Sequence, residues 1–348
     1  MAKWIKNAYD KALTYENLMR AHELSKKGKR NRKEIILFEI NKEKNIEELY
    51  NDLKYGRYAH GSYTSFKVYE PKERTIEKAP YRDRIVHRWI VDNFLIPYYI
   101  PSLIQTTYAC ISKRGMHASA INLQKGLRKM KKSYRNFYIL KMDIRKYFNN
   151  IDKNILWRIL SRRIKDKKVM WVIGQVLKAQ PRKKGIEIGN YTSQTFANIY
   201  LNEVDQYVTR ILKVKYYYRY MDDIVLFTKT KQDAKDILEK IKIFLRDNLE
   251  LELNDKTAIF KSNQGVNFCG YKINEYRLKI RDKGKRKFKK KNKKLLRAVK
   301  VGAISSKEAR QFLNGHIGYF FTANTYNLRK KHIWLESELK EATKVLFV

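Results

Sequence analysis

Two adjacent aspartates are the first candidates for chemistry in this chain. Asp222 and Asp223 lie between residues 216–218 and residues 224–227, two short segments rich in aromatic and β-branched side chains. This pattern predicts a β-hairpin with Met221 and both aspartates at its turn, because Asp tolerates turn geometry. Neighbouring carboxylates repel each other unless a cation lies between them, and such oxygen ligands suit Mg²⁺. An Asp-Asp turn that merely faces solvent is the more common case, so the pair needs support from other residues.

A third aspartate supplies that support. Asp143 follows an apolar segment that we predict to be a core strand over residues 136–144, and a predicted helix over about 152–163 comes next. Carboxylates from two strands converge if the hairpin pairs beside the first strand. Together they would ligate two Mg²⁺ ions, with Mn²⁺ as the alternative. Such ions lower the pKa of an attacking hydroxyl and neutralise the reacting phosphate in phosphoryl transfer.

The composition indicates a folded protein with a polyanionic partner. The 348 residues are 43% hydrophobic and 13% aromatic, which predicts a substantial core and two or three subdomains. Lys+Arg 77 against Asp+Glu 35 gives a formal net charge of +42, a field that attracts nucleic acid. Two cysteines exclude a disulfide framework and a zinc site. No apolar run approaches the ~20 residues of a membrane span, and no signal peptide is evident, so we expect a cytoplasmic protein without a membrane partner.

The elements that must position the aspartates follow a recognisable order. Strand, helix, strand-hairpin, helix and strand between residues 136 and 273 predict an α+β palm on an antiparallel sheet. Pro71 opens a further predicted hairpin, with Lys72 and Arg74 at its tip. From residue 282 the chain becomes lysine-rich, which marks a subdomain boundary, and aromatic residues beyond it favour a folded basic helical module over a disordered tail. Further helices are predicted by apolar periodicity in the first forty residues and at 45–53, 85–95, 118–130, 192–208 and 232–248.

Five ordered motifs resemble those of reverse transcriptases. They are Tyr220-Met221-Asp222-Asp223, the segment Asp-Ile-Arg-Lys-Tyr-Phe at 143–148, the loop Ile-Gly-Asn-Tyr-Thr-Ser-Gln at 188–194, Leu-Asn-Asp-Lys-Thr at 253–257 and Phe-Cys-Gly-Tyr at 268–271. The resemblance covers roughly residues 35–280. It implies a right-hand polymerase fold with a basic helical N-terminal extension (1–34), fingers (35–135), a palm (136–280) and a basic helical thumb (281–348).

The resemblance also implies roles for individual residues. The carboxylates of Asp143, Asp222 and Asp223 and the carbonyl of Ile144 would bind the metals, with Asp223 the least certain direct ligand. Lys256 would protonate the departing pyrophosphate, although a surface lysine beside a strand is the alternative. The remaining matches would bind the nucleotide (Lys72, Arg74, Tyr147, Phe148, Ile188, Gly189 and Gln194) or the primer (Tyr220, Met221, Phe268, Cys269, Gly270 and Tyr271).

Two of these assignments have specific alternatives. Phe148 matches an aromatic steric gate that excludes a ribose 2′-hydroxyl, but a core aromatic would produce the same pattern. Lys72 and Arg74 match the residues that clasp the triphosphate, and Lys67 is the alternative to Lys72 because the hairpin is short.

The loop at 188–194 separates subfamilies. Many reverse transcriptases have Gln-Gly-x-x-x-Ser-Pro, whereas Ile188, Ser193 and Gln194 here resemble enzymes of diversity-generating retroelements, which misincorporate at template adenines. That resemblance implies a bacterial, archaeal or phage gene, deoxynucleotides, a dedicated template RNA with a cDNA or RNA primer, and a basic oligomeric helical accessory protein. A retron or phage-defence reverse transcriptase and a non-catalytic RNA-binding scaffold are the alternatives.

Overall fold

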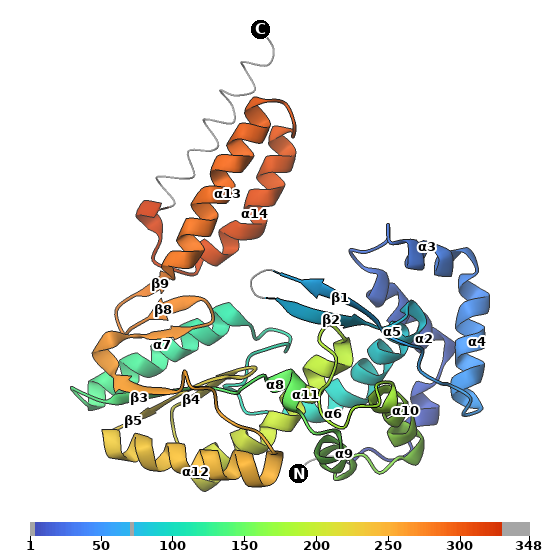
Figure 1. Cartoon of the computed structure of the whole chain (residues 1–348), viewed down its shortest axis with the longest axis horizontal. Helices are drawn as coiled ribbons and strands as arrows, with labels where there is room; N and C mark the ends of the chain where they lie inside the picture. Colours follow the sequence, from blue (N-terminus) through green and yellow to red (C-terminus); the bar gives the residue numbers. More distant parts are fainter. Residues whose placement is uncertain (1–3, 70–72, 329–348) are drawn as a thin grey trace. The chain divides into compact units, whose positions relative to one another are not determined.

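The computed structural model describes residues 4–69 and 73–328, and the chain divides into two compact units (Figure 1). Unit 1 contains Met1–Gln105, Asp143–Lys213 and Glu239–Asp255. Unit 2 contains Thr106–Met142, Val214–Leu238 and Lys256–Val348. Each unit is therefore assembled from three separate stretches of sequence. The mixture of helices and antiparallel sheets confirms the α+β class.

Unit 1 is mainly helical. Its core surrounds Trp89 and Phe94, which are fully buried, with Tyr9 packed edge-on against Trp89 at 5.5 Å between ring centroids. Thr14, Asp152 and Asp166 cap helix N-termini through their side chains, which fixes where α2, α9 and α10 begin. The helices are α1 (Tyr9–Ala12), α2 (Tyr15–Lys26), α3 (Lys33–Ile40), α4 (Lys42–Lys54), α5 (Tyr81–Ile90), α6 (Ile96–Tyr99), α8 (Tyr147–Asn150), α9 (Lys153–Ser161), α10 (Lys167–Lys178) and α11 (Tyr191–Gln206), with π-helical turns at Val91–Leu95 and Tyr207–Ile211 and a 3-10 turn at Ile100–Ser102.

The sequence predicted most of these helices but not α10.

One two-stranded antiparallel hairpin, β1 (Thr64–Val68) and β2 (Arg74–Lys78), projects from the helices of unit 1 with most of its residues solvent-exposed (Figure 1). This confirms the hairpin predicted around Pro71. Pro71 and Lys72 themselves lie outside the described residues.

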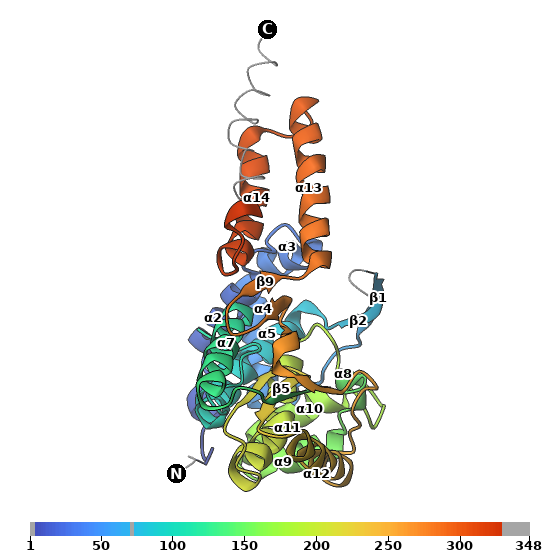
Figure 2. The same cartoon turned by 90° about the vertical axis from the view of Figure 1, so that its left-hand side faces the viewer.

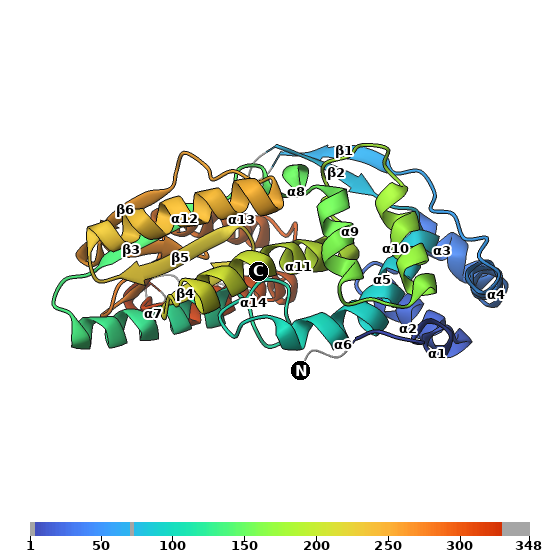
Figure 3. The ribbon, with the colours of Figure 1, turned by 90° about the horizontal axis from the view of Figure 1, so that it is seen from below.

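Unit 2 contains two antiparallel sheets and helix α7 (Met116–Ser133). The larger sheet has the order β4 (Tyr217–Tyr220), β5 (Asp223–Thr228), β3 (Tyr138–Asp143) and β6 (Ala258–Lys261), which is visible in Figure 3. The smaller sheet joins β7 (Val266–Phe268), β8 (Tyr271–Ile273) and β9 (Leu278–Ile280). Apolar residues from α7 and both sheets form one buried cluster. Helix α12 (Lys231–Leu249) follows β5, and its sequence continues from unit 2 into unit 1.

A helical pair completes the described part of unit 2. Helices α13 (Asp282–Lys300) and α14 (Ser306–Phe321) run side by side (Figure 2) and pack through a small core of Leu295, Val299, Ala309 and Leu313. The lysine-rich segment thus lies inside one continuous helix, because its few apolar residues fall on one face while its lysines point outward. Of the helices described, none is long and apolar enough to cross a membrane.

Candidate active site

The predicted aspartate hairpin is present in unit 2. Tyr220 pairs with Asp223, so Met221 and Asp222 form a two-residue turn, and Met221 adopts a positive φ of 55°. Arg219 lies fully buried beneath the turn, and its Nη1 donates a hydrogen bond of 3.1 Å to the Met221 carbonyl. The backbone of Arg219 also bonds to Thr106 and Tyr108. Asp223 thus begins β5 instead of lying in the turn as predicted, and the hairpin that carries both carboxylates is anchored through Arg219.

Lys141 is a site residue that the sequence reasoning missed. Its Nζ lies 2.6 Å from Asp223 Oδ1 and 2.8 Å from the Asn267 carbonyl oxygen, so it connects the aspartate turn to β7. The signal was strand alternation, since residues two apart on β3 share one face and Lys141 precedes Asp143 by two. An ammonium on this face offsets part of the repulsion among the carboxylates.

The third aspartate lies at the end of its strand as predicted. Asp143 is the last residue of β3, and the strand order makes β3 the neighbour of β5, which begins at Asp223. All three aspartates are partly exposed, and carboxylate oxygens in such a setting are ligands that suit a hard divalent ion. Their joint metal coordination, together with the Ile144 carbonyl, stays a prediction.

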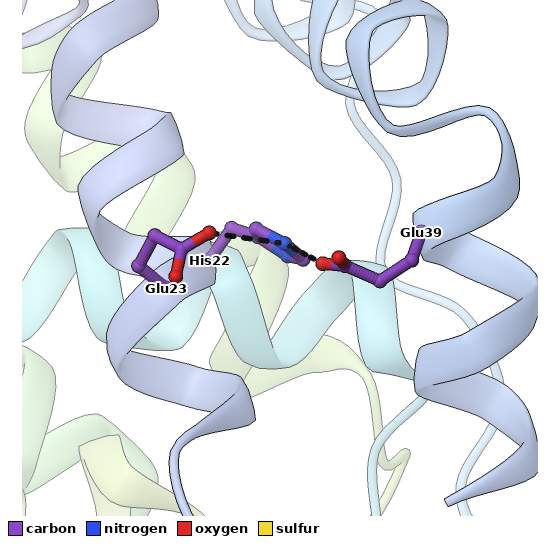
Figure 4. Close-up of side chains that lie close together, drawn as sticks. All are labelled: His22, Glu23 and Glu39. Atoms are coloured by element: carbon purple, nitrogen blue, oxygen red, sulfur yellow. Dashed lines mark hydrogen bonds and ion pairs between the residues drawn. The ribbon is translucent and has the colours of Figure 1, made fainter. Parts of the chain in front are cut away.

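A different group in unit 1 also has metal-binding residue types. His22 lies between Glu23 and Glu39, as Figure 4 shows, with its Nε2 hydrogen-bonded to Glu39. However, the Lys26 ammonium lies 2.5 Å from Glu23 Oε1 and 3.0 Å from Glu39 Oε1. This lysine already supplies the positive charge that the two carboxylates require, so the group is best described as an ion-pair network that joins α2 to α3.

The predicted nucleotide loop in unit 1 is held against the β1–β2 hairpin. Gly189 has φ 116°, and a Cβ there would lie 3.1 Å from Ile76 Cγ2 of β2. Arg182 pairs with Glu77 of β2 and lies 3.4 Å from Glu187, just before the loop. Burial raises the pKa of Glu187, and the nearby cations act in the opposite direction. Ile188 and Gly189 thus lie beside the hairpin strand that carries Arg74.

Two histidines fix the start of α11, and the sequence reasoning missed both. His87 Nδ1 lies 3.1 Å from Thr192 Oγ1, and His87 Nε2 lies 2.9 Å from His60 Nε2. Only one of two facing imidazole nitrogens can carry the shared proton. Burial, with the nearby His60 and Arg84, lowers the pKa of His87 to about 3, so this histidine is neutral at physiological pH. The helix that follows the loop is therefore anchored to α5 by the hydrogen bond between Thr192 and His87.

Other predicted nucleotide-site residues differ in exposure. Tyr147 is only 2% exposed, and its hydroxyl donates to the Ala197 carbonyl at 2.6 Å, so it fastens α8 to α11. Phe148 is half-buried against the Tyr147 ring, with the ring centroids 5.7 Å apart. Gln194 is half-buried on α11 and Arg74 is exposed on β2. Direct contact of any of them with a nucleotide stays a prediction, and Lys72 lies outside the described residues.

The predicted primer-binding turn is a tight hairpin in unit 2. Phe268 pairs with Tyr271, while Cys269 and Gly270 form the turn with φ 48° and 82°. Two positive φ angles characterise the turn type that matches strand twist. Tyr319 of α14 donates to the Gly270 carbonyl at 2.6 Å. Burial raises the pKa of Cys269 to about 12, so its thiol is unreactive at physiological pH.

The predicted site residues therefore fall into two sets. Unit 1 holds Asp143, Ile144 and the residues assigned to the nucleotide, whereas unit 2 holds the aspartate turn, the primer-binding turn and Lys256. Lys256 is exposed two residues before β6, a position that suits either a proton donor or an ordinary surface lysine.

Comparisons with known proteins agree with these motifs. The protein YkfC of Escherichia coli (strain K12) is 26% identical over 252 residues, which cover 60% of this chain and 66% of YkfC. The group II intron-encoded protein LtrA of Lactococcus lactis subsp. cremoris is 27% identical over 203 residues, 38% of this chain and 34% of LtrA. The chain thus spans less than two thirds of the length of either relative.

A solved structure and a family profile complete the comparison. The structure of apo telomerase from Candida tropicalis, truncated from its C-terminal domain, matches with a TM-score of 0.45 and 14% identity, covering 66% of this chain and 58% of that one. Reverse transcriptases in general use divalent metal ions, for which the aspartates described above are suitable ligands. The family profile described as reverse transcriptase (RNA-dependent DNA polymerase) matches residues 71–273, more than half of the chain. The chain therefore belongs to the reverse transcriptase family.

Proposed function

We propose that this protein is an RNA-directed DNA polymerase that copies a dedicated RNA template with low fidelity in a diversity-generating retroelement. The observation that carries the polymerase activity is the aspartate turn, which buried Arg219 and the Lys141–Asp223 ion pair hold in place. The observation that favours the retroelement role is Ile188 in a loop that ends in Ser193 and Gln194.

The reaction joins a primer to a deoxynucleotide. The primer 3′-hydroxyl loses its proton and attacks the α-phosphorus, and the new P–O bond forms as the bond to pyrophosphate breaks. Asp143, the Ile144 carbonyl, Asp222 and Asp223 would hold two Mg²⁺ ions, or Mn²⁺, which when bound neutralise phosphate charge and lower the pKa of the hydroxyl. Arg74 and Lys72 would hold the triphosphate, Phe148 would exclude a ribose 2′-hydroxyl, and Lys256 would donate a proton to the leaving pyrophosphate.

Primer extension on an RNA template tests the polymerase. Asp222→Ala should lower the incorporation rate by about 10²–10³-fold or more, the range for loss of one preorganised electrostatic group. Asp236→Ala removes an exposed aspartate from α12 and should extend primers like the wild type. Equal extension by wild type and Asp222→Ala would contradict the role assigned to Asp222, whereas no extension by the wild type would support a non-catalytic RNA-binding scaffold.

The fidelity assignment is tested at Ile188. An aliphatic side chain cannot make the amide hydrogen bonds of a glutamine near the incoming base, so geometry at this point is less restricted. Ile188→Gln should reduce misincorporation opposite template adenine, scored by sequencing of cDNA. Ile211→Gln changes an exposed isoleucine outside the loop and is the matched control. Unchanged error at adenine in Ile188→Gln would contradict the role of this residue.

The assignment further predicts two partners. One is a structured RNA that serves as template and supplies the priming site, and the other is a basic oligomeric helical accessory protein. A retron or phage-defence enzyme has the same catalytic motifs and is the competing assignment. A template repeat and a nearly identical variable repeat beside the gene would distinguish a diversity-generating retroelement from a retron and from a phage-defence system.

A further inference from the structure

A large cavity lies in unit 1 away from the predicted nucleotide loop. It measures ≈ 1230 Å³ and is lined by the C-terminal half of α11, the end of α9, residues 97–105 and Trp4. Gln194 of the loop and Gln206 at the cavity are twelve residues apart on α11, or about 18 Å along the helix. A volume above the roughly 300–1,000 Å³ of a small-molecule site suits a segment of a polymer. The catalytic assignments leave this cavity unused.

Trp4 is held at the wall of this cavity by backbone pairing. Its neighbour Ile5 is fully buried, donates from its backbone N to the Arg163 carbonyl at 3.0 Å, and accepts from Lys165 N at 2.9 Å. The indole of Trp4 nevertheless stays 58% exposed. Lys6 and Lys165 place their Nζ atoms 5.3 and 5.2 Å from its ring. An anchored, exposed aromatic between two cations is the arrangement on which proteins stack a nucleic-acid base.

Three arginines stand among the otherwise mostly neutral residues of the wall. Arg162, Arg163 and Arg210 line the cavity, and Glu203 accepts from Arg162 Nη1 at 2.7 Å. The Arg163 guanidinium lies over the Tyr99 ring at 5.2 Å and donates to Ser102 Oγ at 2.7 Å, so it is fixed in orientation. Three guanidinium groups against one carboxylate complement a phosphate backbone.

Hydrogen-bond acceptors also line the cavity beside the arginines. Gln206 Nε2 donates to Ser102 O and Asn202 Oδ1, but its Oε1 is buried without a hydrogen-bond partner among the described residues. Glu203 is an acceptor that lines the cavity. A ribonucleotide can offer its 2′-hydroxyl or base N–H groups to such a carboxylate while its phosphate oxygens face the arginines.

We propose that this cavity binds a single-stranded RNA segment at a site separate from polymerisation. A base stacks on Trp4, phosphates contact Arg162, Arg163 and Arg210, and a ribose or base donor reaches the Glu203 carboxylate. The site would anchor one part of the RNA while another part is copied. The inference rests on the proposed function only in taking the anchored RNA to be the template molecule.

Binding of a labelled eight-nucleotide RNA tests the site. The full-length protein is first saturated with template–primer duplex, and octamer binding is then followed by fluorescence anisotropy. Trp4→Ala should weaken this binding by about 5- to 150-fold, the range for one stacked base. Arg210→Ala should weaken it and lower the salt slope by about 0.7, the value for one phosphate of a single strand. Arg210 is exposed, so the second variant is informative even if the first disturbs the N-terminal pairing.

Tyr55→Ala is the matched control. Tyr55 is 62% exposed and has Lys54 Nζ and Arg57 Cζ 5.6 and 5.2 Å from its ring, but it does not line this cavity. Its loss should leave octamer binding unchanged. Wild-type affinity in both cavity variants would overturn the proposal. It would also be overturned if an octaglutamate peptide bound tightly at Trp4 without displacing the RNA octamer. Both cavity variants should still extend a short template–primer, so failure of polymerisation with a retained Trp4 effect would count against the proposed function alone.

Discussion

At the residue scale, Lys141 is the most informative side chain of the candidate site. It touches Asp223 on one side and the Asn267 carbonyl on the other, and it shares its face of β3 with Asp143. This ammonium orients the Asp223 carboxylate, and it would compete with a metal ion for that carboxylate.

Replacement of Lys141 should separate positioning from charge. We expect Lys141→Ala to lower kcat for primer extension by about tenfold or more, because it removes a charge-assisted hydrogen bond of about 1.5–3 kcal/mol that orients Asp223. Lys141→Arg should recover part of the rate, and KM for the nucleotide should change little in either variant. Lys272→Ala, an exposed lysine on β8, is the control. A wild-type rate in Lys141→Ala would show that the ion pair is dispensable.

His87 predicts a dependence of stability on pH. Its pKa is about 3 in the folded protein and about 6.5 when unfolded, so the unfolded state binds the proton more readily as pH falls. The contribution is present above pH 6.5 and is lost progressively toward pH 3, amounting to about 2 kcal/mol between pH 7 and pH 5. Urea unfolding at both pH values should show this loss in the wild type and a smaller one in His87→Gln. Identical pH dependence of the two proteins would exclude His87 as its source.

At the element scale, the nucleotide loop depends on the fit between α11 and the β1–β2 hairpin. Gly189→Ala should place a methyl group 3.1 Å from Ile76 Cγ2 in a backbone conformation that L-residues rarely adopt. Strain of this kind costs about 1–3 kcal/mol and should displace the loop from β2. We expect a higher KM for the deoxynucleotide and a lower unfolding midpoint. Gly115→Ala, where φ is −179° and a Cβ meets nothing within 4 Å, should change neither quantity.

The same elements show how far sequence patterns reach. Alternation and turn residues predicted the β4–β5 and β1–β2 hairpins, and apolar periodicity predicted α4, α7, α11 and α12, because these patterns are local. The right-hand α+β fold of reverse transcriptases follows from the five ordered motifs. By contrast, Lys141 and His87 act through partners that are distant in sequence. Strand alternation places Lys141 on the face of Asp143, but it does not show that this lysine meets Asp223 on a neighbouring strand.

Helix α13 lies in the segment where a basic helical module is predicted. The lysine-rich run itself is helical, because the helix begins at Asp282 and continues to Lys300. Lysine is a good helix former, and Leu295 and Val299 on one face suffice to pack against α14. Charge density alone therefore does not indicate the secondary structure of this segment.

At the scale of the whole molecule, the net charge of +42 is the dominant physical property. Lysines and arginines are concentrated on α13, and three arginines line the cavity beside Trp4. A nucleic acid releases several counter-ions when such side chains neutralise several of its phosphates. Binding then falls steeply with salt, by about 10²–10⁴-fold between 50 and 200 mM for roughly six to ten contacts with a single strand.

Helix α13 allows this electrostatic account to be tested without disturbing the fold. Lys289, Lys290 and Lys293 are exposed, so replacing all three with Gln removes charge but no buried contact. If they contact phosphates, the slope of log K against log salt should become shallower by about 2, since each contact on a single strand contributes about 0.7. The triple Lys→Arg variant keeps the charge and should keep the wild-type slope, as measured by anisotropy with the full template RNA. A flat salt response in the wild type would mean that the positive field does not hold the RNA, whereas an unchanged slope in the Gln variant would locate the phosphate contacts away from this face of α13.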